Sequence, residues 1–161
     1  MKPGDHPEFF RFPPPEGRSR ESTIVLGKDG RFFHDGEPVS HQGMQRAFAS
    51  WLRRHPDDGR YILSNGYDWT YLTVEGAARF VEAVRSDAGR PVLVLFDGIE
   101  RPLDPTELRV DAAGALSVAL PDGEPAALTA AAQLQLEPWL AERDGVVGLR
   151  VGSDFFPLAG A

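Results

Sequence analysis

Histidine and aspartate side chains gather around one predicted turn, and both residue types can bind metal ions or small ligands. His34 and His41 flank an Asp-Gly-Glu-Pro segment at residues 35–38, and Asp29 lies shortly before it. Zinc sites built from imidazole and carboxylate ligands show recurring spacings, which this segment does not match. The pattern therefore predicts no metal site. It leaves His34 and His41 as candidate ligand-binding residues, or simply as residues at a strand end and a helix start.

A second candidate is an aromatic stripe. Tyr67, Trp69 and Tyr71 alternate along one predicted strand, so they share one face of it. Such a face can stack a planar ligand, although aromatic stripes are more often the core face of a sheet. Arginines of the same half of the chain could add positive charge for a small anionic ligand: Arg46, Arg60 and Arg79.

No motif predicts catalysis. The chain has no cysteine, and the phosphate-loop, dinucleotide-binding, His-Glu-x-x-His and Gly-x-Ser-x-Gly patterns are all missing. Asp97 follows an apolar run, as the nucleophile of haloacid-dehalogenase phosphatases does. Those enzymes place a second aspartate two residues later, where this chain has Ile99. The sequence thus identifies no catalytic residue and no cofactor, and it leaves enzymatic activity undecided, with non-enzymatic binding favoured.

Turn signals show which elements would position the candidate residues. Asp29-Gly30 joins two apolar runs within residues 23–34, and Asn65-Gly66 joins two more within residues 60–74. Both dipeptides favour the positive φ angles of tight hairpin turns. Two β-hairpins are therefore predicted.

Apolar spacing predicts the helices. A helix capped by Ser40 and running through His55 to Pro56 would carry one apolar stripe: Met44, Ala47, Phe48, Trp51 and Leu52. Residues 77–84 show a shorter helical pattern, and Pro91–Phe96 reads as a buried strand.

Parts of the first half recur in the second half. Three short segments return in the same order, with a shift of about 87 residues: Asp-Gly-Glu-Pro (35–38, 122–125), Trp-Leu (51–52, 139–140) and Asp-Gly (58–59, 144–145). The predicted fold is α+β, with two tandem, structurally similar units. Each is a small antiparallel sheet with a packed helix, in a strand–strand–helix–strand repeat. The first unit would span residues 23–100 and the second residues 101–161.

Residues 1–22 contain prolines and three phenylalanines and predict a strap that packs on the body of the protein. The net charge of −7 comes from residues 91–161, because residues 1–90 hold 13 acidic and 13 basic residues. This balance argues against nucleic acid as a partner. The longest apolar run is far too short to cross a membrane, and the start of the chain has no secretory pattern, so a cytoplasmic location is expected.

Residues 24–81 contain three segments, KDGRFFHDGEPVS, DGRYIL and WTYLTVE, together with Phe48, Leu52 and Phe80. In these residues and their spacing the chain resembles a bacterial family, domain of unknown function 1285. The family usually continues Val-Glu-Asp-Ala-Pro-Phe, whereas Val74-Glu75 is followed here by Gly-Ala-Ala-Arg-Phe. The resemblance implies an α+β fold of two similar units with a role in signalling or ligand binding. It implies no catalytic residues.

Three functions remain open on the sequence. The first is a binding or regulatory module for a small molecule or a protein, with His34, His41, Tyr67, Trp69 and Tyr71 as its candidate residues. The second is a small hydrolase using Asp or His residues in a groove between the two units. The third is an oligomeric interaction protein, although no oligomeric state follows from the sequence.

Overall fold

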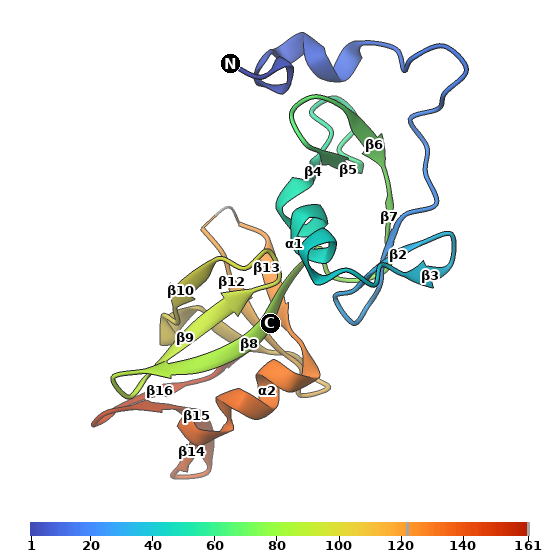
Figure 1. The fold of residues 1–161 in the computed structure, drawn as a ribbon. Coiled ribbons are helices and arrows are strands. Elements are labelled where there is room, and N and C mark those ends of the chain that lie inside the picture. Colours follow the sequence, from blue (N-terminus) through green and yellow to red (C-terminus); the bar gives the residue numbers. More distant parts are fainter. Residues whose placement is uncertain (122, 161) are drawn as a thin grey trace. The chain divides into compact units, whose positions relative to one another are not determined.

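The computed structural model describes residues 1–121 and 123–160 and has an α+β fold (Figure 1). The chain divides into two compact units, Met1–Gly76 and Ala77–Ala161. Asp122, which opens the second Asp-Gly-Glu-Pro segment, lies outside the described residues.

The first unit contains a helix, short strands and two 3₁₀ turns. Its elements are η1 (Pro3–Asp5), η2 (Pro7–Arg11), β1 (Val25–Leu26), β2 (Phe32–His34), β3 (Glu37–Pro38), α1 (Gln42–Trp51), β4 (Leu52–Arg54), β5 (Tyr61–Ser64), β6 (Trp69–Tyr71) and β7 (Thr73–Val74). They form two sheets, with the strand orders β3-β2-β1-β7 and β4-β5-β6. Pairing within them is antiparallel except between β1 and β7.

Both predicted hairpins are confirmed. Gly30 has a φ of 86° and the Gly27 N–H donates to the Arg31 carbonyl at 2.9 Å, which closes the turn between β1 and β2. Between β5 and β6, the Asn65 Oδ1 atom accepts hydrogen bonds from the backbone N–H groups of Tyr67 and Asp68, each at 2.8 Å. Side-chain acceptance of this kind is why asparagine favours turns.

The first helix is shorter than the sequence predicts. It ends at Trp51, and Leu52–Arg54 forms strand β4 instead of a last helical turn. The reason is non-local, because β4 pairs with β5 and the His55 N–H donates to the Arg60 carbonyl at 2.7 Å. The sheet partner supplies hydrogen bonds that a continued helix would have supplied locally.

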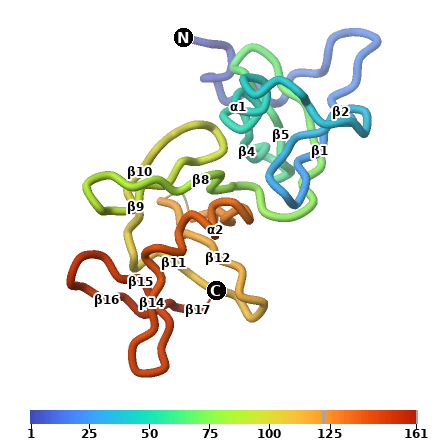
Figure 2. The backbone as a smooth tube through the Cα atoms, turned by 60° about the horizontal axis from the view of Figure 1, so that its bottom comes forward, coloured from blue at the N-terminus to red at the C-terminus, as the bar shows by residue number. Residues whose placement is uncertain are grey.

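The second unit is built around a wider sheet. Its elements are β8 (Arg79–Asp87), β9 (Arg90–Leu95), β10 (Glu100–Pro102), η3 (Pro105–Glu107), β11 (Leu108–Val110), β12 (Leu116–Ala119), β13 (Pro125–Leu128), α2 (Ala130–Leu136), η4 (Glu137–Trp139), β14 (Leu140–Arg143), β15 (Val146–Val151), β16 (Asp154–Pro157) and β17 (Ala159–Gly160). The sheets have the strand orders β10-β9-β8-β13-β12-β11-β17 and β14-β15-β16. Helix α2 packs on β8 and β13, which are labelled in Figure 1. Figure 2 shows the path of the backbone from a second direction, with α2 next to the segment labelled β8. The core cluster of this unit includes Val81, Leu93 and Leu136, all fully buried.

The helix predicted over residues 77–84 is wrong, since β8 begins at Arg79 and residues 79–84 are strand. A β-bulge between Val81 and Ala83 shifts the register against β9 by one residue. That extra residue brings Val81 and Val84 onto the same face of the strand. Two apolar residues three positions apart on one face are also what an amphipathic helix would show. Phe80 is buried on the other face, so the strand lacks simple alternation.

The boundary drawn at residues 100 and 101 also needs correction. The sequence boundary places β8 and β9 in the first unit, yet β8 pairs in parallel with β13, and the compact units meet at residues 76 and 77. Parallel pairing joins segments far apart in the sequence, and no local pattern reveals it.

A series of elements in the second unit, which follows β8, β9 and β10, has the same order as a series in the first unit. The series β1-β2-β3-α1-β4-β5-β6-β7 and β11-β12-β13-α2-β14-β15-β16-β17 have the same pairings, including the parallel pairs β1–β7 and β11–β17. Each helix also carries a glutamine that accepts a backbone hydrogen bond from a sheet strand. Gln45 Oε1 accepts from the Phe32 N–H at 2.8 Å, and Gln133 Oε1 accepts from the Leu116 N–H at 3.0 Å.

Candidate functional site

The two candidate histidines both lie at the surface. His34 ends β2 with its side chain 59% exposed, and its Nε2 atom lies 3.7 Å from Asp35 Oδ2. His41 is the residue before α1 and is also exposed. Within residues 1–121 and 123–160, no three His, Asp or Glu side chains gather where they could hold a metal ion.

The predicted aromatic stripe is split between core and surface. Trp69 is only 6% exposed, and it clusters with Ile62 and with Phe9 and Phe10 of the strap (residues 1–22). Tyr67 is 65% exposed, and Phe12 of the strap is 61% exposed. The buried part of the stripe is therefore the surface on which the strap's two adjacent phenylalanines pack.

His55, which no sequence pattern marks as a candidate site residue, lies at the centre of this cluster. It is 6% exposed, and its ring contacts those of Phe10, Trp69 and Tyr71. Its Nδ1 atom accepts from the Asp57 N–H at 3.0 Å, and its Nε2 atom lies 3.0 Å from the Phe10 carbonyl oxygen. The only local sequence signal at His55 is that it precedes Pro56, and this position does not indicate burial.

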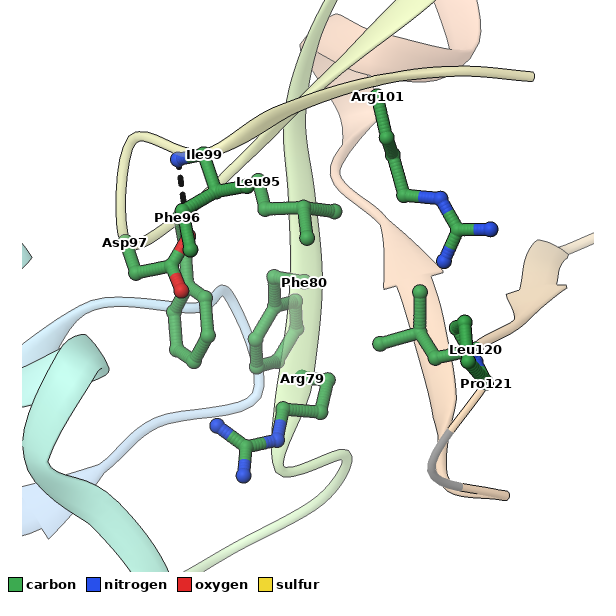
Figure 3. A pocket seen from close by; sticks show the side chains of 9 residues that line it. All are labelled: Arg79, Phe80, Leu95, Phe96, Asp97, Ile99, Arg101, Leu120 and Pro121. Atoms are coloured by element: carbon green, nitrogen blue, oxygen red, sulfur yellow. Dashed lines mark hydrogen bonds between the residues drawn. The ribbon is translucent and has the colours of Figure 1, made fainter.

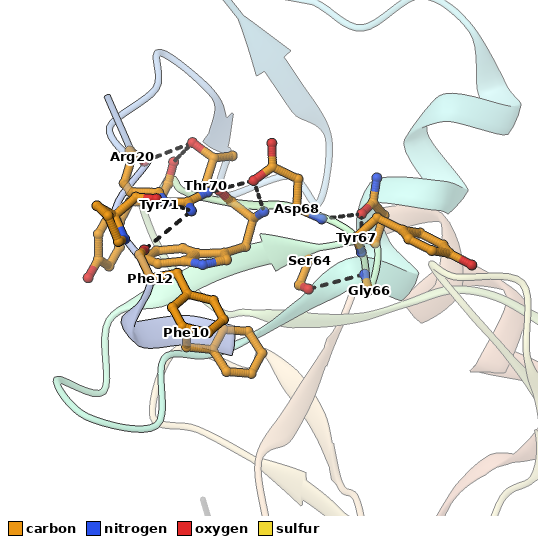
Figure 4. Close-up of polar contacts among 12 residues, drawn as sticks. Phe10, Phe12, Arg20, Ser64, Gly66, Tyr67, Asp68, Thr70 and Tyr71 are labelled. Carbon is orange, nitrogen blue, oxygen red and sulfur yellow. Dashed lines mark hydrogen bonds and ion pairs between the residues drawn. The ribbon is translucent and has the colours of Figure 1, made fainter. Parts of the chain in front are cut away.

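Charged groups lie at the edge of the aromatic cluster, and Figure 4 shows two of them, Arg20 and Asp68. Arg20 of the strap lies over the Trp69 ring, 4.4 Å from its centroid, and its Nη1 atom bonds Asp68 Oδ1 at 2.5 Å and the Trp69 carbonyl oxygen at 2.9 Å. Arg60 lies over the Tyr71 ring and forms a bidentate pair with Glu21 of the strap, at 2.8 and 2.9 Å. These contacts hold the strap against the unit.

Tyr71 and Asp58 share a short hydrogen bond. The Tyr71 hydroxyl donates to Asp58 Oδ2 at 2.6 Å, and this bond lowers the pKa of the Asp58 carboxyl below its ordinary value. Burial, followed by the same hydrogen bond, raises the pKa of the Tyr71 phenol. The Tyr71 hydroxyl is already bonded to Asp58, and the ring lies under Arg60. Tyr71 therefore has a structural role in this cluster.

The second unit contains an apolar cleft of about 380 Å³ (Figure 3). Its apolar lining comes from the start of β8, the β9–β10 turn and the end of β12: Phe80, Leu95, Phe96, Ile99, Leu120 and Pro121. The rings of Phe80 and Phe96 are 5.7 Å apart and tilted by 60°, and both side chains are almost fully buried. They form the apolar wall of the cleft, since the two rings pack on each other and little of either is exposed.

Charged residues line the rest of the cleft. Arg79 and Arg101 have side chains that are 21% and 23% exposed, and each lies near a glutamate. Arg101 Nη2 bonds Glu107 Oε2 at 3.2 Å, whereas Arg79 Nε lies 3.7 Å from Glu124 Oε2. A guanidinium has five N–H donors, so one carboxylate leaves donors of Arg101 for another acceptor.

Asp97 also lines the cleft, but its carboxylate serves the turn. Asp97 Oδ1 accepts from the Ile99 N–H at 3.0 Å, and the Gly98 N–H donates to the Leu95 carbonyl at 2.8 Å. Asp97 thus fixes the shape of the β9–β10 turn. No local sequence pattern predicts the cleft, because residues 79, 101 and 120 meet only after β8 joins the sheet.

The comparisons with known proteins bear on the fold. No family model matches the sequence, and no curated protein matches it significantly. Among solved structures, a DUF1285 family protein from Silicibacter pomeroyi DSS-3 superposes with a TM-score of 0.60 at 20% identity, covering 94% of this chain and 93% of that one. A DUF1285 family protein from Shewanella baltica OS155 superposes with a TM-score of 0.52 at 17% identity, covering 70% of this chain and 88% of that one. The resemblance to this family is confirmed at the level of the fold.

Proposed function

We propose that this protein is a binding module whose second unit takes up a small amphiphilic molecule in the cleft. The observation that carries the proposal is the combination of a rigid apolar wall, made by Phe80 and Phe96, with two arginines at the cleft. Ligand pockets are typically concave and mostly apolar, with a few polar groups that fix orientation, and a volume of about 380 Å³ suits a small ligand.

The charges favour a ligand that carries a carboxylate. The apolar wall would hold a hydrocarbon or aromatic body, and Arg101 would direct its remaining N–H donors to an acceptor. Arginine binds carboxylates through charge-assisted and often bidentate hydrogen bonds. A neutral ester of the same body would keep the apolar contacts and lose this recognition.

Binding can be tested by calorimetry and thermal shift with the full chain. The probes are medium-chain fatty acids and aryl carboxylates, each compared with its methyl ester. We expect one acid series to bind saturably, and Arg101→Gln to weaken it by about tenfold, because a hydrogen bond to a charged group is worth roughly 1.5–3 kcal/mol. Leu120→Trp fills the cleft and should abolish binding.

The matched control is Arg90→Gln. Arg90 is an exposed arginine of β9 in the same unit that does not line the cleft. Its substitution should leave binding unchanged. Equal affinity for acids and esters would refute the role of Arg101, and binding that survives Leu120→Trp would refute the cleft as the site.

The shared order of elements supports a further proposal, that the two series arose by duplication of one strand–strand–helix–strand unit. We propose that this binding module, which has no catalytic signature, acts in signalling or regulation. We further propose that it acts in the cytoplasm and does not bind nucleic acid. The net charge of −7 supports the last point, because phosphate backbones repel an acidic surface. Among the described residues, no helix is long and apolar enough to cross a membrane.

A further inference from the structure

A second surface of interest is the outer face of the sheet β14-β15-β16, which has a hollow of about 360 Å³. It lies apart from the cleft, with no lining residue in common, and is lined by Ala141, Glu142, Arg143, Arg150, Ser153 and Phe155. We call this surface the arginine face. What it binds can be inferred from the corresponding surface of the first unit.

The strand registers define the correspondence. Leu140 pairs with Leu149 as Leu52 pairs with Leu63, and Arg150 pairs with Phe155 as Ser64 pairs with Trp69. Because side chains alternate along a strand, each matched pair also fixes the faces of its neighbours. The arginine face therefore corresponds to the face of β4-β5-β6 that carries Trp69.

In the first unit, that face is covered by a peptide segment of this same chain. Phe9 and Phe10 of the strap are buried against Ile62 and Trp69, and the ring centroids of Phe10 and Trp69 lie 6.2 Å apart. Arg53, on β4, lies over the Phe10 ring, 4.4 Å from its centroid. The fold thus uses this face to hold two adjacent aromatic residues, with an arginine above one of them.

The arginine face also combines an aromatic ring with arginines, but the register matches Arg53 to Ala141, so its arginines stand at other positions. The ring of Phe155, which corresponds to Trp69, lies against Gly148, where a Cβ atom would come within 2.5 Å of Phe155 Cζ. Glycine is needed at this position because any larger residue would push the ring away. Phe155 remains partly exposed and gives the hollow an aromatic surface.

The arginines of this face favour a binding partner that carries negative charge. In the described part of the chain, Arg143 and Arg150 form no ion pair or side-chain hydrogen bond, although Glu142 lies at the rim of the hollow. Both side chains are exposed. Arginines seek carboxylates and also stack on aromatic rings, so together they suit a segment in which an acidic residue adjoins an aromatic one.

We propose that the arginine face binds a peptide segment of a partner protein in which an acidic residue stands next to aromatic residues. The strap itself provides the pattern, since Glu8 precedes Phe9 and Phe10. The aromatic side chains would lie against Phe155, and the carboxylate would pair with Arg143 and Arg150. This proposal is independent of ligand binding in the cleft.

The test uses a fluorescent peptide with the sequence of residues 6–12, His-Pro-Glu-Phe-Phe-Arg-Phe, and measures anisotropy against the full chain. We expect saturable binding that Arg150→Glu weakens by at least about tenfold, since it replaces an attraction with a repulsion. Phe155→Ala should weaken it similarly. A peptide with lysine in place of its glutamate should bind about tenfold more weakly to the unchanged protein.

Arg90→Glu is the matched control, because it makes the same charge change on the same unit away from the arginine face. It should leave the affinity within about twofold. Circular dichroism and the thermal midpoint show whether each variant is folded. If Phe155→Ala does not fold, the affinity of Arg150→Glu alone tests the proposal.

One alternative outcome is exchange of the peptide with the strap on the first unit. In that case Phe10→Ala would raise the affinity, and Arg150→Glu would leave it unchanged. That result, or the absence of saturable binding to the unchanged protein, would overturn the proposal.

Discussion

The carbonyl oxygen of Phe10 lies 3.0 Å from Nε2 of His55, and this contact joins the strap to the core of the first unit. Since Nδ1 of the same ring accepts the Asp57 N–H at 3.0 Å, the proton of a neutral His55 is assigned to Nε2, which donates to Phe10. Both ring nitrogens of a side chain that is 6% exposed are thus satisfied by backbone groups of different segments.

Replacing His55 by leucine should release the strap. Leucine is similar in size to histidine and fills the same space, but it cannot form hydrogen bonds. The Phe10 carbonyl and the Asp57 N–H then lose their partner, at a cost of about 1–3 kcal/mol in the free energy of unfolding. We expect faster tryptic cleavage after Arg11, with the rest of the chain intact at first. Limited proteolysis followed by mass spectrometry measures this.

The control for that experiment is His34→Leu, since His34 is exposed at the end of β2. Trypsin should cleave this variant after Arg11 at the same rate as the unchanged protein. If His55→Leu were cleaved no faster than His34→Leu, the hydrogen bond to Phe10 would not be what holds the strap.

Local signals predicted the parts of the fold that depend on local energetics. Asp29-Gly30 and Asn65-Gly66 favour tight turns whatever surrounds them, so their hairpins could be predicted. Strand β8 could not, because its bulge gives it the apolar spacing of a helix, and its partners β9 and β13 decide the outcome. The end of α1 at Trp51 was missed for the same reason, since β5 competes for Leu52.

The candidate site shows the same division. Alternation placed Trp69 and Tyr71 on one face, but nothing local indicated that Phe10 would cover Trp69. The cleft was missed because Arg79 and Arg101 become neighbours only through the sheet. Single residues at turns were predictable, and surfaces assembled from distant strands were not.

The hydrogen bond between Tyr71 and Asp58 should make stability depend on acid pH. It lowers the pKa of Asp58 in the folded protein, so its contribution is fully present above the ordinary aspartate pKa of about 4 and is lost as the pH falls through the lower folded value. Tyr71→Phe removes the bond. The difference in unfolding free energy between the two proteins should therefore be constant near neutral pH and shrink below about pH 4.

Chemical denaturation at a series of pH values measures this difference. Tyr67→Phe is the control, because Tyr67 is exposed and its substitution removes a hydroxyl remote from Asp58. A difference that stayed constant to the lowest pH would show that the Asp58 pKa does not depend on Tyr71.

Gln45 should contribute more to the free energy of unfolding than the exposed residues of the same helix. Its amide oxygen accepts from the Phe32 N–H at 2.8 Å, and its amide nitrogen donates to the carbonyls of Phe32 and Val39 at 3.0 and 2.8 Å. Gln45→Met removes the Gln45 partner of the Phe32 N–H and of the Val39 carbonyl next to the buried Phe32 ring, whereas the Phe32 carbonyl keeps the Val39 N–H as a donor, so the cost is about 1–3 kcal/mol. Urea denaturation measures the loss, with exposed Gln42→Met on the same helix as the control. Equal effects of the two substitutions would contradict this role.

The turn between β8 and β9 offers a stabilising substitution. Ala88 has a φ of 50° and Gly89 a φ of 78°, so both central residues of this hairpin occupy the left-handed region. Alanine is strained there, at about 1 kcal/mol, whereas asparagine tolerates this conformation and is common in such turns. Ala88→Asn should therefore raise the free energy of unfolding by about 0.5–1 kcal/mol. Ala112→Asn, in an exposed turn where the alanine has no positive φ, should give no gain. Chemical denaturation of both variants checks the prediction, and equal stability of the two would show that the alanine at this turn carries no strain.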